Sequence, residues 1–304
     1  MFWSIIFNLL MLISIVAHPL PAKMFVQGNI LSLKANHSWL EIRAKSGVLY
    51  DPADHLFLFQ QNANHVQPIA SISKLMTALV FLKHNPGWGK IYRITKADNI
   101  IGGKIHLFLG EQVTVKDLFY TSLVASDNGA TMALVHSTGL SEANFVQQMN
   151  LTAKHLGLVN THFVEPTGLS TDNVSTAHDV ALLAQAAFAQ PAIRQATTKA
   201  EYDYKTLGGR QKRIISTDYL LAHQASSTIR VLAGKTGFTD QAGYCFAGLL
   251  QTHSSSSPVF ISVVLNSSSK VERFLQSEQI LNWALNSYNL KLLSSASTLN
   301  SNDF

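Results

Sequence analysis

The spacing of apolar positions divides the chain into strand-rich ends and a helical middle. Between about 113 and 198, apolar side chains recur at helical spacing, and Thr114, Ser141 and Thr176 stand where capping residues open a helix. Short apolar runs bounded by turn residues predict strands on both sides of this region. The pattern predicts an α/β fold with a mainly helical lobe in the middle of the chain. The predicted strands are 39–50, 56–59, 91–94, 105–109, 201–205, 212–216, 229–234, 242–250 and 259–265, and the closing helix is 271–288.

The first helix is predicted to run from about Ser71 to His84, where an Asn-Pro-Gly sequence ends it. Its apolar residues cover more than one face, as in a buried helix. Ser71 and Lys74 stand three positions apart at its start, so their side chains can meet. A lysine can activate a serine only if burial or another cation lowers its pKa. Alone, this spacing is a weak signal, because an ordinary capped helix start explains most such matches.

Composition narrows the class of protein. Hydrophobic residues make up 47% of the 304 residues and charged residues 13%, which indicates a globular chain. The net charge of +5 comes without a dense basic run, which argues against a nucleic-acid partner. The one cysteine, Cys245, permits no intramolecular disulfide and no thiolate metal site, and is expected in the core. The histidines form no metal-ligand pattern, so neither a metal nor another cofactor is expected.

The first residues are almost continuously apolar up to Ala17 and are followed by small residues and prolines up to Ala22. Residues 1–22 are therefore interpreted as a signal peptide, although no Lys or Arg precedes the apolar run; the alternative is a retained N-terminal anchor. In either case the body of the protein is expected to be exported, in a bacterium to the periplasm. Membrane contact is expected only if this segment is retained. Residues 291–304 form a polar tail.

Three short motifs follow one another along the chain: Ser71-Ile72-Ser73-Lys74, Ser126-Asp127-Asn128 and Lys235-Thr236-Gly237. Each could be an ordinary cap, turn or strand end, but together they form the described signature of β-lactamases and penicillin-binding proteins. The chain resembles the D-alanyl-D-alanine carboxypeptidases of peptidase family S11, the low-molecular-mass penicillin-binding proteins. Segments 68–78, 124–130, 165–170 with 173–176, and 234–240 look most like its endopeptidase branch, the penicillin-binding protein 7 type.

The resemblance implies a β-lactamase/transpeptidase-like fold, in which an antiparallel sheet of about five strands is covered by the first and last helices and carries the inserted helical lobe. The peptidase domain would span about 38–290, with the helical lobe over about 113–198. It also implies catalytic roles. Ser71 would attack the substrate carbonyl, Lys74 would take its proton, and Lys235 would keep Lys74 neutral by repulsion. Ser126 would relay the proton to the leaving amine. The backbone N–H groups of Ser71 and Phe238 would form the oxyanion hole.

The same resemblance implies a set of substrate contacts. Asn128 would hydrogen-bond the peptide of the substrate, and Lys235 and Thr236 would hold a substrate carboxylate through charge-assisted hydrogen bonds. Gly237 has no side chain to obstruct a substrate strand laid along this edge. Peptidoglycan peptides are the implied partners, and β-lactam antibiotics the implied covalent inhibitors.

The implied function is a serine DD-peptidase that forms an acyl-enzyme, with the endopeptidase that cleaves the D-alanyl-meso-diaminopimelate crosslink as the first choice. A D-alanyl-D-alanine carboxypeptidase is the nearest alternative. A class A-like β-lactamase is another, because such enzymes use a glutamate on a loop after the second motif for deacylation. Glu165 lies in the segment 165–170, which looks like the corresponding loop of the peptidase family, so a structural role is expected for it. A non-catalytic penicillin-sensing or wall-binding protein is the alternative from another class.

Overall fold

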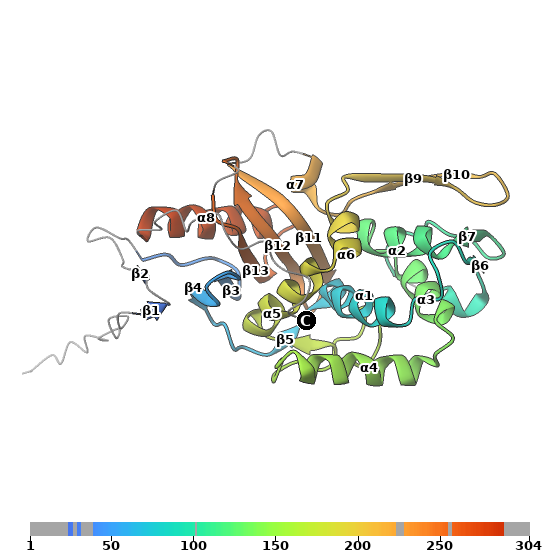
Figure 1. The fold of residues 1–304 in the computed structure, drawn as a ribbon, viewed down its shortest axis with the longest axis horizontal. Helices are drawn as coiled ribbons and strands as arrows, with labels where there is room; N and C mark the ends of the chain where they lie inside the picture. Colours follow the sequence, from blue (N-terminus) through green and yellow to red (C-terminus); the bar gives the residue numbers. More distant parts are fainter. Residues whose placement is uncertain are drawn as a thin grey trace, which may run out of the picture.

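The structure is a computed structural model that describes residues 24–26, 29–31, 39–100, 102–222, 228–254 and 257–288. Figure 1 shows a lobe built around a sheet on one side and a mainly helical lobe on the other. The predicted signal peptide at 1–22 and the polar tail at 291–304 lie outside the described residues. Among the helices that are described, none has the length and apolar content needed to cross a membrane.

The main sheet joins segments from the two ends of the chain. Its five antiparallel strands lie in the order β11, β12, β13, β3, β4. Val48 pairs with Val263 where the N-terminal hairpin completes the C-terminal strands. This confirms the predicted five-stranded antiparallel sheet. The strand bounds are Ser46–Asp51 (β3), Leu56–Gln61 (β4), Ile229–Thr239 (β11), Gly243–Thr252 (β12) and Phe260–Ser267 (β13).

Alternating side chains give each face of the sheet its own core. On β13, Val264 packs with the closing helix α8 (Glu272–Ser287), while Val263 belongs to the larger core under the helical lobe. Burying such a side chain is worth about 1.5–3 kcal/mol. The last helix covers the sheet as predicted. On the other face, α5 (Ala177–Ala189) rather than the first helix makes the main contacts, because its many alanines allow close approach to the strands.

The helical lobe contains the predicted helices and their caps. The Thr114, Ser141 and Thr176 side chains each accept a backbone N–H of the first turn that follows. Pro191 begins a further helix directly after α5, as its fixed φ and missing N–H allow. The helix bounds are Ser73–Lys83 (α1), Val115–Val124 (α2), Asn128–Ser137 (α3), Glu142–His155 (α4) and Pro191–Thr197 (α6), with 3-10 turns Ala70–Ile72 (η1) and Lys96–Asp98 (η2).

One predicted strand is wrong over its whole length and another over its first part, for the same physical reason. Residues 105–109 form an irregular loop, because the N–H groups of His106 and Phe108 donate to side-chain carboxylates instead of to a neighbouring strand. Residues 39–45 are likewise irregular, since Ile42 and Ala44 hydrogen-bond to glutamine side chains. The periodicity of apolar residues does not show where a side chain replaces a neighbouring strand as the hydrogen-bond partner of the backbone.

Short strand pairs complete the described structure. The predicted hairpin of β9 and β10 packs on α2, where the Tyr202 hydroxyl donates to Asp117 at 2.8 Å. The β5–β8 pair brings the loop after Phe163 beside η1. A short helix α7 follows the hairpin. The bounds are Met24–Val26 (β1), Asn29–Leu31 (β2), Gln67–Pro68 (β5), Ile91–Arg93 (β6), Gln112–Thr114 (β7), Val174–Ser175 (β8), Glu201–Lys205 (β9), Gln211–Ile215 (β10) and Tyr219–Ala222 (α7).

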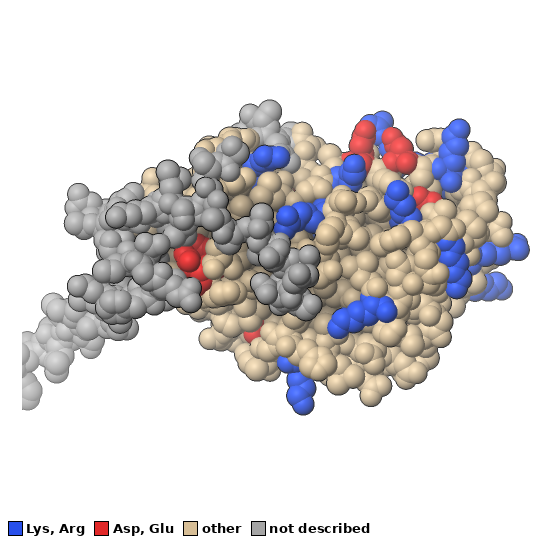
Figure 2. Space-filling model, viewed as in Figure 1, with Lys and Arg blue, Asp and Glu red and all other residues tan. Residues whose placement is uncertain are grey.

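Basic side chains are spread over the visible surface. Figure 2 shows lysine and arginine residues scattered singly or in small groups on this face, with acidic residues between some of them. The face therefore carries no continuous basic track of the kind that follows a phosphate backbone.

Candidate active site

Ser71 lies in the 3-10 turn η1, and the α-helix begins at Ser73 rather than at Ser71. Ala70 has a φ of 49°, an uncommon backbone conformation for a residue with a Cβ. The turn presents the Ser71 side chain, which is partly exposed, at the head of α1. Helix α1 is buried along most of its length, as its apolar pattern predicts, so the turn projects from the interior of the protein.

Two glycines hold this turn from opposite sides. A Cβ on Gly168, where φ is 84°, would collide with the carbonyl group of Ala70. A Cβ on Gly237 would lie 3.2 Å from the backbone nitrogen of Ser71. Neither position can carry a side chain without displacing the turn. Strand β11 therefore runs directly beside the backbone N–H of Ser71.

The Lys74 ammonium group is fully buried and has three polar neighbours. Its Nζ atom lies 2.9 Å from Ser71 Oγ, 2.7 Å from Asn128 Oδ1 and 2.6 Å from the carbonyl oxygen of Thr167. Burial lowers the pKa of Lys74 to about 7, and the negative charges of Glu165 and Asp127 limit this shift. Near neutral pH a large fraction of Lys74 is therefore a free amine beside the serine hydroxyl.

Lys235 is a second buried amine on the opposite side of the site. Its Nζ atom donates to Ser126 Oγ at 2.8 Å and to the carbonyl oxygen of Thr236 at 2.8 Å. Burial lowers the pKa of Lys235 well below its usual value, and the positive charges of Lys74 and Arg273 lower it further. The expected repulsion between the two lysines thus acts on the pKa of Lys235, whereas burial is the cause that lowers the pKa of Lys74.

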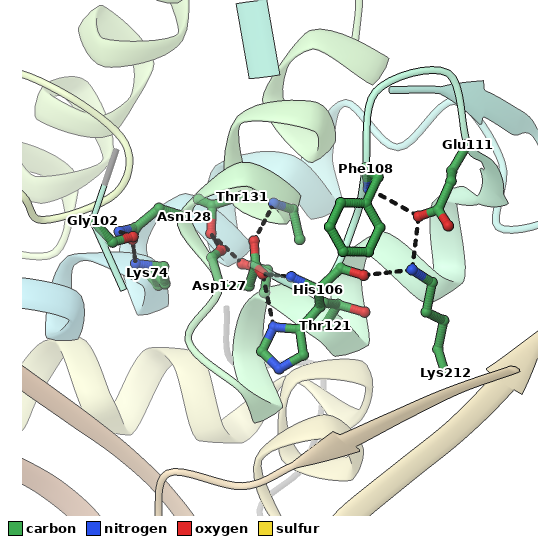
Figure 3. A network of polar contacts seen from close by, with 12 residues as sticks. Lys74, Gly102, His106, Phe108, Glu111, Thr121, Asp127, Asn128, Thr131 and Lys212 are labelled. Atoms are coloured by element: carbon green, nitrogen blue, oxygen red, sulfur yellow. Dashed lines mark hydrogen bonds and ion pairs between the residues drawn. The ribbon is translucent and has the colours of Figure 1, made fainter. Parts of the chain in front are cut away.

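The second motif forms the break between α2 and α3. Ser126 has a φ of 59°, which turns the chain between the two helices, and Asp127 caps α3 by accepting the N–H of Ala130 at 2.7 Å. Asn128 is the first residue of α3, and its amide donates to the carbonyl oxygen of Gly102 at 2.9 Å while its oxygen accepts from Lys74 (Figure 3). Both ends of the Asn128 amide are therefore fixed.

The third motif lies within β11, before its end. The Thr236 hydroxyl pairs with that of Thr217 at 2.5 Å. Phe238 is 48% exposed and stacks on Tyr244 of the neighbouring strand, with ring centroids 4.3 Å apart. β11 is an edge strand of the described five-stranded sheet, and it runs beside the turn that carries Ser71. All the predicted site residues therefore lie on the elements that surround Ser71.

The hydrogen bonds of Glu165 are structural ones, as predicted. Its carboxylate accepts hydrogen bonds from within its own loop, including the N–H of Thr167 at 2.6 Å, the N–H of Gly168 at 2.6 Å and the amide of Asn173 at 3.0 Å. These bonds shape the loop that carries the Thr167 carbonyl and presses Gly168 against the turn of Ser71. Cys245 is fully buried, also as predicted.

Several groups around the site were not predicted. The Thr167 carbonyl is a backbone atom, which no residue type signals. Asp218 and Arg273 lie behind β11: Arg273 donates to the carbonyl oxygen of Gly237 at 3.2 Å, and burial raises the pKa of Asp218 to about 7. The position of Arg273 at the start of an amphipathic helix gave no sign of this contact. In the described part of the chain, no three histidine, cysteine, aspartate or glutamate residues gather as metal ligands do.

Comparison with known proteins agrees with this geometry. The family model of the S11 peptidases, described as D-alanyl-D-alanine carboxypeptidase, matches residues 33–269. A D-alanyl-D-alanine endopeptidase of Pseudomonas aeruginosa is 32% identical over 251 residues, which are 80% of this chain and 77% of that protein. The chain belongs to peptidase family S11. It is accordingly a serine-type D-Ala-D-Ala peptidase, a hydrolase.

Other members of the S11 family are similar to a comparable degree. The carboxypeptidase DacF of Bacillus subtilis is 31% identical over 258 residues, which are 83% of this chain and 64% of that protein. Penicillin-binding protein D2 of Listeria monocytogenes, in its cefotaxime-bound form, superimposes with a TM-score of 0.69 at 30% identity over 82% of this chain and 100% of that chain. The Streptomyces K15 DD-transpeptidase gives a TM-score of 0.73 at 25% identity over 82% and 99%. The fold is that of these transpeptidases.

Proposed function

We propose that this S11 peptidase is an exported DD-endopeptidase that hydrolyses the D-alanyl-meso-diaminopimelate crosslink of peptidoglycan through an acyl-enzyme on Ser71. The observation that carries the proposal is the contact of 2.9 Å between Ser71 Oγ and Lys74 Nζ, in a setting that lowers the lysine pKa to about 7. A serine hydroxyl needs such a neighbouring base to become a nucleophile at neutral pH.

In the acylation step, a bond forms between Ser71 Oγ and the substrate carbonyl carbon, and the hydroxyl proton passes to Lys74 Nζ. The carbonyl oxygen gains negative charge and accepts the N–H groups of Ser71 and Phe238; losing one such donor typically costs about 10²–10³ in rate. The closeness of Gly237 to the Ser71 nitrogen supports this pairing across the turn and β11. When the carbon–nitrogen bond breaks, the leaving amine takes a proton from Ser126.

The proton on Lys74 then passes to Ser126 and restores its hydroxyl, and Lys74 is again neutral. In deacylation, water attacks the ester carbon, gives its proton to Lys74, and Ser71 Oγ leaves as a hydroxyl when that proton returns. The short contact of Lys235 with Ser126, 2.8 Å, supports an oriented relay.

Substrate binding is assigned to the edge strand and the second motif. An extended peptide laid beside β11 would add a strand to the sheet edge, with the Asn128 amide on its other side. Lys235 and Thr236 would hold a substrate carboxylate. The arriving negative charge would raise the depressed pKa of Lys235, so that binding itself restores the ammonium form.

The hydrogen bonds of the Glu165 carboxylate within its own loop favour a peptidase over a β-lactamase. Both oxygens of this carboxylate accept hydrogen bonds from loop donors, so the group is not presented to a water on the acyl-enzyme. β-Lactams are proposed as covalent inhibitors that acylate Ser71 and leave slowly. The cefotaxime-bound form of penicillin-binding protein D2 supports this proposal by similarity.

The choice of endopeptidase over carboxypeptidase follows the endopeptidases of Pseudomonas aeruginosa and Escherichia coli, each 32% identical to this chain. Incubation with purified crosslinked and uncrosslinked muropeptides, followed by mass analysis, tests it. We expect the crosslinked dimer to be split, and Ser71→Ala to abolish the reaction. Release of D-alanine from uncrosslinked pentapeptides without dimer cleavage would establish the carboxypeptidase instead, and no turnover of either would leave a non-catalytic binding protein.

Export is proposed from the apolar segment at 1–17 and the small residues that follow it. The test is the mass and location of the protein made from the full chain in a Gram-negative host. A periplasmic product that lacks about the first 22 residues is expected. A full-length product in the membrane fraction would support the retained anchor.

A further inference from the structure

The loop formed by residues 102–111 is fastened to the second motif at two points. At its start, the Gly102 carbonyl oxygen accepts from the Asn128 amide at 2.9 Å. In its middle, His106 donates its backbone N–H at 3.0 Å and its ring Nδ1 at 2.8 Å, both to Oδ2 of Asp127 (Figure 3). The loop thus contacts both residues that follow Ser126.

The Asp127 carboxylate divides its two oxygens between helix α3 and this loop. Oδ1 accepts the N–H of Ala130, and Oδ2 accepts both donors of His106. The side chains are almost fully buried, with 3% of Asp127 and 8% of His106 exposed. Because a carboxylate can only accept, the proton lies on Nδ1 of His106 whether the ring is neutral or charged.

The far side of the loop is also anchored. Lys212 of β10 donates to the His106 carbonyl oxygen at 2.7 Å and to Glu111 Oε2 at 2.7 Å, and its Nζ atom lies 4.7 Å from the centre of the Phe108 ring. Only 7% of the Lys212 side chain is exposed. His106 is therefore fixed by hydrogen bonds to both the buried Lys212 and Asp127, so its position is well defined.

The backbone conformation of Ser126 depends on its neighbours. Its φ of 59° is unfavourable for a residue with a Cβ, and such a conformation persists only where neighbouring groups hold it in place. Asp127 is the next residue. If Oδ2 of Asp127 loses a hydrogen-bond donor, the peptide group between Ser126 and Asp127 can rotate. Ser126 Oγ then moves away from Lys235 Nζ, which lies 2.8 Å from it in this structure.

We propose that His106 is a positioning residue of this peptidase: through Asp127 it fixes Ser126 for proton transfer and, with Gly102, the orientation of Asn128. It does not contact the substrate itself. The inference rests on the proposed role of Ser126 in acylation, and it assigns a function to a loop that carries none of the three motifs.

The test compares His106 variants by the second-order rate constant of acylation with a fluorescent penicillin. In His106→Asn the amide nitrogen takes the place of Nδ1, whereas in His106→Gln it reaches only the place of Nε2. We expect His106→Ala and His106→Gln to be acylated about 10²-fold more slowly, as for displaced catalytic groups, and His106→Asn to recover to within about tenfold of the wild type.

His136→Ala is the matched control, because it also removes a histidine bonded to a buried aspartate, Asp98 at 2.6 Å, but at the other end of α3. Thermal unfolding is measured for every variant. We expect His106→Ala and His136→Ala to lose similar stability while only the former loses acylation. Equal acylation rates in the wild type and His106→Ala, or equal losses in His106→Asn and His106→Gln, overturn the inference. Absence of acylation in the wild type overturns the proposed function instead.

Discussion

The Nζ atom of Lys74 lies 2.9 Å from the Oγ atom of Ser71, at a position that solvent does not reach. The same Nζ also contacts the Thr167 carbonyl oxygen at 2.6 Å and Asn128 Oδ1 at 2.7 Å. Two acceptors thus orient the lysine while burial weakens its hold on the proton. The contact between the serine hydroxyl and the lysine amine is thus already formed in the protein without a substrate.

The pH dependence of acylation should report this lysine. Because only the neutral amine can accept the serine proton, the second-order rate constant should rise about tenfold per pH unit below the pKa of about 7 and level above it. Acylation by a fluorescent penicillin from pH 5 to pH 9 measures the profile of the free enzyme. A rate constant that stays level from pH 5 to 7 would show that Lys74 is not the base.

The charge of Glu165 should affect the pH at the midpoint of the acylation profile. Glu165 raises the pKa of Lys74, so Glu165→Gln should move the midpoint of the acylation profile to lower pH. The amide also leaves loop donors unpaired, which typically costs about 1–3 kcal/mol each, so a lower melting temperature is expected. Glu142→Gln, which removes an exposed carboxylate bonded to His136, is the control for charge alone. An unchanged or higher midpoint in Glu165→Gln would contradict the electrostatic account.

The same variant separates the peptidase from a β-lactamase. If Glu165 only shapes its loop, the lifetime of the penicilloyl adduct on Ser71 should change little in Glu165→Gln. If Glu165 activated the deacylating water, the wild type would turn penicillin over rapidly and the variant would accumulate the adduct. Intact-mass analysis after rapid mixing with benzylpenicillin follows both outcomes.

The sequence predicted those parts of the site that reside in side-chain type and order. Ser71, Lys74, Ser126 and Lys235 could be found because hydroxyl and amine groups recur in motifs at specific elements. The Thr167 carbonyl could not, because every residue has such an atom and only the tertiary fold aims it.

The fold was predicted to a similar extent. The five strands of the sheet were recognisable because their buried faces impose alternating or continuous apolar runs. Loop 102–111 was partly misread as a strand, since Ile105 and Leu107 alternate with other residues. The backbone N–H groups of His106 and Phe108 in this loop donate to the side chains of Asp127 and Glu111. The local alternation of apolar and polar residues does not indicate these contacts. Hydrogen bonds of this kind depend on where side chains lie in the folded protein, and sequence periodicity carries no information about that.

Asp218 should make the stability of the protein fall with pH. Burial raises its pKa from 3.8 to about 7, and its Oδ2 atom has no hydrogen-bond partner among the described residues. The folded state therefore holds more protons than the unfolded state between these values. The free energy of unfolding should decrease from pH 4 to 7, by at most about 1.4 kcal/mol per unit from this group, and then level.

Asp218→Asn removes this titration and keeps an oxygen that can accept the N–H of Leu220, now bonded at 3.0 Å. Urea unfolding of both proteins from pH 4 to pH 8 measures the difference. The variant should gain stability relative to the wild type as pH rises to about 7, with no further gain above it. A constant difference across this range would show that Asp218 does not titrate there.

Gly168 should be indispensable because of its contact with the turn of Ser71, beyond its backbone conformation. Its φ is 84° and a Cβ would strike the Ala70 carbonyl, whereas Gly157 has a φ of 71° and nothing within 4 Å of a Cβ. Gly157→Ala should therefore cost only the left-handed backbone strain, about 1–2 kcal/mol, and acylate normally. Gly168→Ala should lose more stability and, because the collision displaces Ser71, acylate about 10²-fold more slowly. Urea unfolding and the fluorescent-penicillin assay on both variants decide the matter: equal losses in the two, with normal acylation, would reduce the role of Gly168 to its φ angle.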